Sequence, residues 1–387
     1  MNEAVVVHSK FTDSQEAGSD LGKRLLAGLQ GEPDAVVLFA SPKFDYPVLL
    51  RSLDAACRPR LLIGCSSAGE FSSQAPRDSS ACALGLRSSE MAFASGVGRG
   101  LRVDRVAAAR ALVSSFRGLS TAEYAYRSAM VLTDALAGHA DQLIEEITIQ
   151  TAGTCQLFGG GAGDDAHFDR THVFLGTEAI PDAAVALEIL SNKPIGIGVR
   201  HGWVPASKPM RVTESDGMRL VSLDAILASE VFEEYARSSG QSFDRDHPLP
   251  FFLHNVLGIQ TGSGYKLRVP LGVHADGSIS CAADVPVGAT VCIMSATAAS
   301  AAQAATEAAE AAIEGLGGNR PKAAIFLDCV ATRLRTGGEF GGELGALENV
   351  LGSTPFAGCN TYGQIARAEG QFEGFHNCTA AICIIPE

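Results

Sequence analysis

Apolar positions along the chain alternate between short buried runs, which are typical of strands, and longer stretches with helical spacing. Ala4 to His8 and Val36 to Ser41 are such runs, and Leu61 to Phe71 predicts a strand that enters a Gly/Ser loop. The helical spacing predicts helices over Ser14 to Gln30, Gly138 to Thr151, Ser222 to Ala236 and Ser300 to Glu314. Asp104 is the predicted N-cap of another helix, whose apolar face would carry Val106, Ala109, Val113 and Phe116.

One pattern occurs three times: a buried strand, a helix, a strand that ends in a Gly-rich turn, and another apolar strand. Its strands cover 36–39, 62–69 and 81–86, then 129–132, 158–163 and 183–188, then 324–327, 356–363 and 379–384. We therefore expect an α/β (α+β) fold with mixed sheets, built from repeated β-α-β-β modules whose helices cover the sheets. Cys65, Gly161 and Cys359 are expected at comparable turns of the three modules.

A stretch rich in polar residues, with one Gly and two Pro, covers 238–254 between a predicted helix and a new set of strands. The chain of 387 residues is long enough for two or three domains. We predict an N-terminal domain over 1–237, a linker region over 238–254 and a C-terminal domain over 255–387.

The formal net charge of −13 and the absence of a long Lys/Arg run argue against nucleic-acid binding, which needs a basic surface. No stretch approaches 18 charge-free apolar residues, so no membrane insertion is expected. The N-terminus lacks the features of a secretory signal, which favours a cytoplasmic protein. The ten cysteines include no C-x-x-C pair, and we interpret them as small buried apolar residues.

Several segments resemble catalytic motifs only in part. The run from Gly159 to Gly163 lacks the spacing of a phosphate-binding loop, and Gly64 to Gly69 has one residue too many for a nucleophile elbow. We interpret Asp164, Asp165, His167, Asp169 and His172 as a solvated acidic loop rather than a metal site. No positioned base is identifiable, so an enzyme is not expected.

The order of several short motifs resembles that of FIST-domain proteins. The N-terminal FIST domain is indicated by GCSSAGE from Gly64, FGGGAGDD from Phe158 and HGWVP from His201. The C-terminal FIST domain is indicated by RVPL from Arg268, TYG from Thr361 and FHNCT from Phe375. The sequence departs from the family pattern at Gln364, where Glu is common, and by an extra residue in the stretch from Cys329 to Arg333.

The resemblance implies a sensory protein. The chain is similar in length to a group of stand-alone FIST proteins that bind haem b, sense nitric oxide and regulate a sensor histidine kinase. For such a protein we predict His201 as the ligand of the haem iron, because it ends an apolar strand beside Gly202 and Trp203. His172 and His254, each at the border of an apolar segment, are the alternatives, with the thiolates of Cys65 and Cys359 after them.

A second interpretation is a FIST sensor for another small ligand, such as an amino acid. Arg268 would bind the ligand carboxylate, in a pocket with Cys359, Tyr362, His376 and Asn377. Both His201 and the His376-Asn377 pair are also compatible with hydrogen-bonded turns. An enzyme of unrecognised type is the third interpretation, and homo-oligomer formation stays open.

Overall fold

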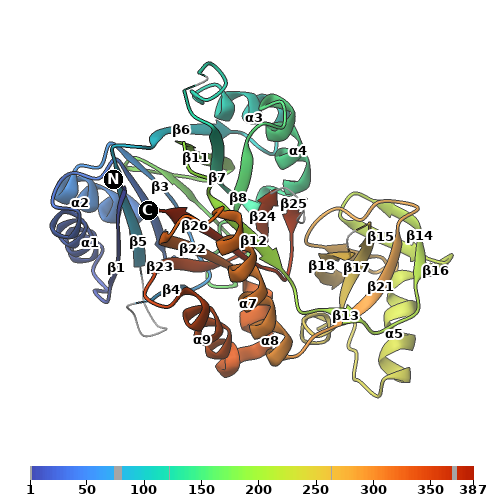
Figure 1. Cartoon of the computed structure of the whole chain (residues 1–387). Helices are drawn as coiled ribbons and strands as arrows, with labels where there is room; N and C mark the ends of the chain where they lie inside the picture. The colour runs from blue at the N-terminus through green and yellow to red at the C-terminus, as the bar shows by residue number, and fades with distance from the viewer. Residues whose placement is uncertain (1, 74–80, 122, 263, 368–372) are drawn as a thin grey trace.

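A computed structural model of the chain describes residues 2–73, 81–121, 123–262, 264–367 and 373–387. The protein is mixed α/β, with three modules forming the body of the molecule and a further sheet forming a lobe on one side (Figure 1). Helices lie on the outer faces of the module sheets (Figure 1). The predicted fold class is therefore confirmed.

The first module contains β1 (Asn2–Ser9), α1 (Ser14–Leu29), β2 (Ala35–Ala40), α2 (Tyr46–Cys57), β3 (Leu61–Ser66), β4 (Glu70–Ser72) and β5 (Ala81–Ser88). The second contains β6 (Ala92–Arg99), α3 (Arg105–Val113), β7 (Tyr126–Thr133), the short 3-10 helix η1 (Ala135–Ala137), α4 (Ala140–Gln150), β8 (Gln156–Gly161), β9 (Val173–Leu175), β10 (Glu178–Ile180) and β11 (Ala183–Ser191). The third contains β12 (Gly196–Arg200), α7 (Ala298–Gly315), β22 (Pro321–Cys329), α8 (Val330–Thr336), η2 (Gly337–Glu339), α9 (Phe340–Leu351), β23 (Phe356–Thr361), β24 (Gln364–Arg367), β25 (Glu373–His376) and β26 (Ala380–Pro386).

The four long strands of each module form a sheet of the same order: β1-β5-β2-β3, β6-β11-β7-β8 and β12-β26-β22-β23. In each sheet the last strand lies between the first two and is antiparallel to both of them. The second and third of these long strands along the chain, such as β2 and β3, are neighbours in the sheet and run parallel. The predicted repeat is confirmed, and each module begins with a further strand and helix that the predicted repeat did not include.

One glycine in each module lies where the parallel strands approach most closely: Gly64, Gly159 and Gly358. A Cβ atom at these glycines would lie 2.1, 1.8 and 1.9 Å from the carbonyl oxygen of the opposite residue on the neighbouring strand. The equivalent residues that follow these glycines are Cys65, Gly160 and Cys359. The expectation that Gly161 shares this position is therefore wrong by one residue.

The modules interlock because each contributes short strands to the sheet of another. The β9–β10 hairpin of the second module extends the first sheet from β3, and the β24–β25 hairpin of the third extends the second sheet from β8. Strand β4 of the first module pairs with β23 of the third. This cyclic exchange joins residues near both ends of the chain in one body.

The lobe is an insertion between β12 and α7 of the third module. It contains β13 (Val204–Pro205), β14 (Met210–Asp216), β15 (Arg219–Leu223), β16 (Ile226–Leu227), α5 (Ala228–Ser238), α6 (Leu249–Phe252), β17 (Val256–Thr261), β18 (Gly264–Arg268), β19 (Pro270–Val273), β20 (Ile279–Cys281) and β21 (Thr290–Ser295). Strands that precede and follow residues 238–254 belong to the same sheet. The stretch predicted as a linker is thus an internal connection of the lobe, and strands of the predicted ranges 1–237 and 255–387 share sheets.

The helix predicted over Ser222 to Ala236 begins six residues later, at Ala228. Asp224 and Ala225 both have positive φ angles, 49° and 64°, and form the two-residue turn between β15 and β16. Asp104 does cap α3 by accepting a hydrogen bond from the Ala107 amide. However, Val106, predicted on the buried face, is 42% exposed.

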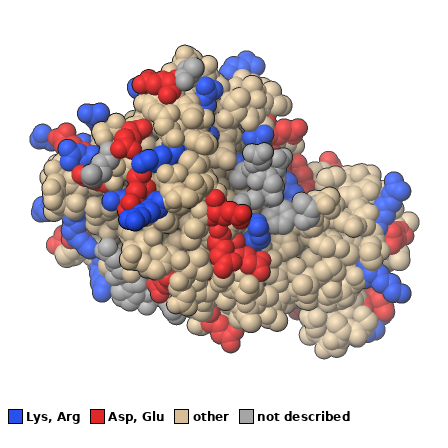
Figure 2. All heavy atoms as spheres, viewed as in Figure 1, with Lys and Arg blue, Asp and Glu red and all other residues tan. Residues whose placement is uncertain are grey.

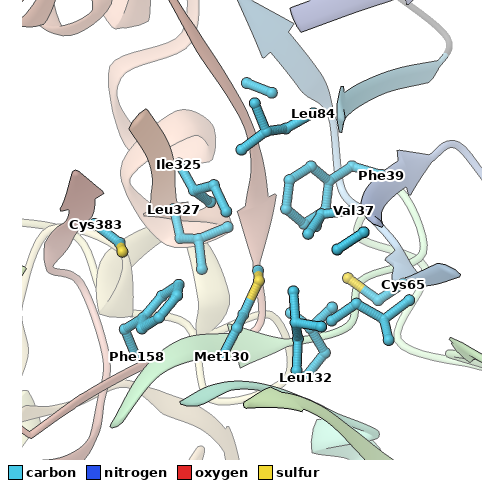
Figure 3. Close-up of a cluster of buried hydrophobic side chains, with 14 of the residues drawn as sticks. Val37, Phe39, Cys65, Leu84, Met130, Leu132, Phe158, Ile325, Leu327 and Cys383 are labelled. Atoms are coloured by element: carbon cyan, nitrogen blue, oxygen red, sulfur yellow. The ribbon is translucent and has the colours of Figure 1, made fainter. Parts of the chain in front are cut away.

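A continuous apolar core fills the space where the three sheets face one another. Figure 3 shows Val37, Phe39 and Leu84 of the first module directed toward Ile325 and Leu327 of the third, with Met130 and Leu132 of the second beside them. All ten cysteines are buried and free, as predicted. Among the described residues we find no helix whose length and apolar content would let it cross a bilayer.

Candidate functional site

A pocket of about 530 Å³ lies between the body and the lobe. Strands β7, β22 and β23 all end beside this pocket. The residues that follow these strands form one of its walls: Leu136, Val330, Ala331, Leu334, Tyr362 and Gly363. The opposite wall comes from the lobe, with Met218, Leu249, Leu253, Val269, Leu271 and Cys281. Ligands of α/β proteins commonly bind beyond the carboxyl ends of parallel strands, so the pocket occupies a favourable place in the fold.

The lining is mainly apolar, with a few polar side chains at defined positions. This is the usual character of a small-molecule site, and the volume lies within the range of roughly 300 to 1,000 Å³ that such sites have. His139, Asp216, Arg219, Ser280, Tyr362 and Asn377 are among the side chains that bring hydrogen-bonding groups to the lining. The arrangement fits a large apolar ligand with few polar groups.

His139 joins the body to the lobe at this pocket. Its Nδ1 lies 3.0 Å from Oδ1 of Asp284, a residue of the lobe that is 145 positions away in sequence. Among the described residues Nε2 of His139 has no hydrogen-bonding partner. The carboxylate selects the tautomer with a proton on Nδ1, which leaves Nε2 with its lone pair as an acceptor or metal ligand.

Tyr362 and Asn377 supply polar groups on the body side. The Tyr362 hydroxyl donates to Asp164, and the Tyr362 ring stacks on Phe168 with ring centroids 4.6 Å apart. Asn377 is only 2% exposed, and its Oδ1 has no hydrogen-bonding partner among the described residues. An unpartnered amide oxygen is costly in a folded protein, so Asn377 is a position where a ligand or water donor would be favoured.

Asp164 organises the loop beneath Tyr362. Its carboxylate accepts hydrogen bonds from the backbone amides of Phe168, Asp169 and Arg170 at 2.8 to 2.9 Å. Burial would raise the pKa of Asp164, but the hydrogen bonds from Tyr362 and these amides outweigh it and lower the pKa. The prediction of a solvated acidic loop is therefore wrong for Asp164, whose side chain is buried and fully paired.

Two pocket cysteines provide a chemical test of this site. Cys281 and Cys329 line the pocket, and burial raises the pKa of Cys281 to about 12, whereas a hydrogen bond from Cys378 lowers the pKa of Cys329 to about 6. Because the thiolate is the reactive form, a small methanethiosulfonate is expected to modify Cys329 before any other cysteine at pH 7. Peptide mapping by mass spectrometry checks the order. Equally fast labelling of the core residues Cys65 and Cys359 would instead indicate general opening of the fold.

The structure places His201 away from the pocket. His201 Nε2 lies 2.9 Å from the carbonyl oxygen of Tyr265, and its Nδ1 accepts from the Trp203 amide at 3.3 Å. The cavity beside His201 measures about 10 Å³, which is room for roughly one water molecule. The predicted role as an iron ligand conflicts with this packing, since both ring nitrogens are engaged and a macrocycle has no space.

The other residues predicted around haem also lie elsewhere. Trp203 is 5% exposed, and the Arg335 guanidinium covers its ring at 5.1 Å from the centroid. The His172 ring packs on Tyr46 with centroids 5.3 Å apart, at the edge of the first module. His254 follows α6 on the surface and does not line the pocket, although its neighbour Leu253 does.

The alternative set predicted for an amino-acid ligand is only partly brought together. Tyr362 and Asn377 line the pocket, whereas Arg268, Cys359 and His376 do not. The Arg268 guanidinium is buried and donates to Asp141 Oδ2 at 2.9 Å and to the Asp284 carbonyl at 2.8 Å. It therefore serves to join α4 and the lobe rather than to bind a ligand carboxylate.

Two family models match the chain. A family model described as FIST N domain matches residues 34–226, and one described as FIST C domain matches residues 228–367. No match to the chain was found among the curated proteins.

Two solved structures align over most of the chain with low similarity. Cyanuric acid hydrolase from A. caulinodans is 9% identical with a TM-score of 0.38, and each chain is covered completely. Phosphoribosylformylglycinamidine synthase II from Thermotoga maritima is 10% identical with a TM-score of 0.22, over 99% of this chain and 71% of that one. Both scores are too low to relate the folds.

Proposed function

Because the chain belongs to the FIST family, whose domains are sensory domains of signal transduction, we propose that the pocket between body and lobe binds the ligand of a sensor. The observation that supports this proposal best is the pocket itself. It is large and apolar, it lies at the carboxyl ends of parallel strands, and it is bordered by a histidine held by a carboxylate of the lobe.

The ligand that we propose is haem b. The pocket provides apolar walls from both body and lobe, and it holds one imidazole whose Nδ1 is paired with a carboxylate while Nε2 is unpaired among the described residues. Iron-ligating histidines commonly have such a partner on the other ring nitrogen. We therefore assign the iron-binding role to His139, with Asp284 as its positioning residue, in place of His201.

Bound haem would supply an iron atom that takes up nitric oxide, as the family resemblance implies. The role of the chain is to report this event to a partner, which we propose to be a sensor histidine kinase. Helix α8 suits this role, because Val330, Ala331 and Leu334 line the pocket while Thr332 and Arg335 line a small polar cavity on its other side. A ligand changes the output only through its different affinities for the two states of such an element.

Haem uptake by His139→Ala and His201→Ala is the test of this assignment. Purified wild type incubated with hemin is expected to show a Soret band at near-stoichiometric occupancy. His139→Ala is expected to lose tenfold or more in hemin affinity, whereas His201→Ala, the matched control, retains it. As a second readout, ferrous protein with and without nitric oxide should differ in its effect on autophosphorylation of a candidate kinase from the same organism.

Each contrary outcome has a separate meaning. A wild-type protein that stays colourless with added hemin contradicts the haem proposal, and protection of Cys329 by other small molecules then tests the pocket alone. Loss of haem in His201→Ala but not in His139→Ala restores the prediction made from the sequence. Equal kinase activity in both ligand states removes the proposed signalling step.

A further inference from the structure

A second hollow of the lobe shares no lining residue with the ligand pocket, and we call it the α5 groove. It has a volume of about 510 Å³ and lies between α5, the β15–β16 turn and the segment after β13. Its floor is apolar, with Met210, Ile226, Val231 and Tyr235 among the lining residues. Ile226 is 50% exposed, and its strand β16 pairs with β15 beside the main path of the lobe sheet.

The rim of the α5 groove is predominantly acidic. Asp224, Glu230 and Glu234 line it, and Lys208 is the basic residue among the lining side chains. Glu234 pairs with the exposed Arg237, whereas no ion pair of Glu230 is found among the described residues. In Figure 2 the lobe shows mainly uncharged surface, with charged side chains gathered near its outer edge. An exposed apolar surface with a polar rim is typical of an interaction site.

Helix α3 of the second module has the complementary character. It buries Ala108, Ala109, Leu112 and Val113 against its sheet, while Val106 and Arg110 face outward. Val103, in the turn before the helix, is 89% exposed. The segment from Arg99 to Arg117 holds five arginines and one aspartate in a chain whose net charge is −13. Arg99 pairs with Glu178, so the basic character of this surface comes from Arg102 and Arg110, which lie beside the exposed Val103 and Val106 on α3 and the turn before it.

We propose that α3 of one copy of this chain docks in the α5 groove of another copy. Val103 and Val106 would contact the apolar floor, and Arg102 and Arg110 would lie near Glu230 and the other acidic residues of the rim. The shape of α3 also suits the α5 groove. Its outward face has small side chains at Ala107 and Ala111, which let the helix approach the groove closely.

The two surfaces belong to different parts of the molecule, because α3 covers the second module and α5 lies on the lobe (Figure 1). Such a contact is heterologous, so it builds closed rings or open chains rather than isologous dimers. The small area of one helix in one groove predicts weak association, since stable interfaces bury roughly 1,200 to 2,000 Å². The proposal does not depend on the identity of the pocket ligand.

Sedimentation velocity of paired charge reversals is the test. Wild type is expected to show a sedimentation coefficient that rises between 1 and 200 μM protein and falls back in 0.5 M NaCl. Glu230→Arg/Glu234→Arg reverses the rim, and Arg102→Glu/Arg110→Glu reverses α3; each variant alone is expected to stay monomeric. An equimolar mixture of the two variants is expected to associate again, because each groove then faces an α3 of opposite charge.

Glu310→Arg/Glu314→Arg on exposed positions of α7 is the matched control, with the same charge change at the same spacing, and should associate like wild type. Circular dichroism confirms that all variants are folded. A wild type that remains monomeric at 200 μM overturns the proposal, as does a mixture that stays monomeric. Binding of a basic peptide to the groove without self-association would instead assign the groove to another protein.

Discussion

One added methyl group at position 358 is expected to prevent stable folding of the whole chain. Gly358→Ala places a Cβ atom 1.9 Å from the carbonyl oxygen of Phe326 on the neighbouring parallel strand and 2.4 Å from the Phe71 ring. Overpacking in a core usually costs about 1 to 3 kcal/mol. Here a paired backbone must move as well, so we expect a loss above about 4 kcal/mol, a large part of the roughly 5 to 15 kcal/mol that stabilises a typical domain.

Urea unfolding followed by circular dichroism measures this effect, together with the soluble yield. Gly342→Ala in α9 is the control, because nothing lies within 4 Å of its Cβ position and the substitution should stabilise the helix by about 0.5 to 1 kcal/mol. Gly64→Ala, whose Cβ would lie 2.1 Å from the Leu38 carbonyl oxygen, is expected to behave like Gly358→Ala. Near-wild-type stability of both would contradict the steric argument, and a loss of stability in only one of them would contradict the equivalence of the modules.

The repeated module could be predicted from the sequence because its strands are continuous apolar runs. Burial on both faces leaves such runs at 36–39, 129–132 and 324–327, and each lies in the centre of its sheet. The strands exchanged between modules could not be predicted. β4, β9 and β10 have three residues each, and β4 and β9 pair with strands of other modules, so the local periodicity of the sequence cannot indicate the pairing.

The insertion of the lobe could not be predicted either, because it too depends on contacts between segments that are distant in sequence. β12 and α7 belong to one module, but the whole lobe separates them along the chain. The polar stretch at 238–254 indicates a surface connection correctly, and only the three-dimensional sheet shows that both of its flanks belong to one unit. The positive φ angles of Asp224 and Ala225 explain the error at 222–227, because neither residue is a glycine that would mark the turn.

Sequence reasoning found part of the candidate site. Tyr362 and Asn377 were identified from motifs and do line the pocket. His139 was missed because its suitability as an iron ligand depends on Asp284, which lies 145 residues away in a different part of the fold. His201 was favoured for its position at a strand end, but that position makes both ring nitrogens available to the backbone.

The stability of the protein is expected to fall as the pH rises from about 4.5 to about 8, with Glu70 as a main cause. Glu70 is 4% exposed in β4, where it receives a hydrogen bond from Ser67 and pairs in register with Cys359. Burial raises the pKa of Glu70 to about 8. The folded protein therefore keeps a proton that the unfolded chain releases above its ordinary pKa near 4.5.

The direction in which stability changes with pH follows from this difference in proton binding. Stability from the protonated carboxyl is fully present below pH 4.5 and is lost progressively as the pH rises through the pKa of the folded state. With about 1.4 kcal/mol for each pKa unit, the loss due to Glu70 amounts to at most about 5 kcal/mol by pH 8. Burial also raises the pKa of Glu343 to about 8, which adds to the slope in the same direction.

Glu70→Gln isolates the contribution of Glu70, because glutamine has the same shape and carries no titrating proton. The variant is expected to match wild type at pH 5 within about 1 kcal/mol and to exceed it by several kcal/mol at pH 8. Urea midpoints at half-unit steps from pH 4.5 to 8.5 give the comparison. Glu310→Gln on the exposed face of α7 is the control and should leave the slope unchanged. Parallel pH profiles for wild type and Glu70→Gln would show that Glu70 is already ionised in the folded protein and that Arg333, whose charge lowers its pKa, outweighs its burial.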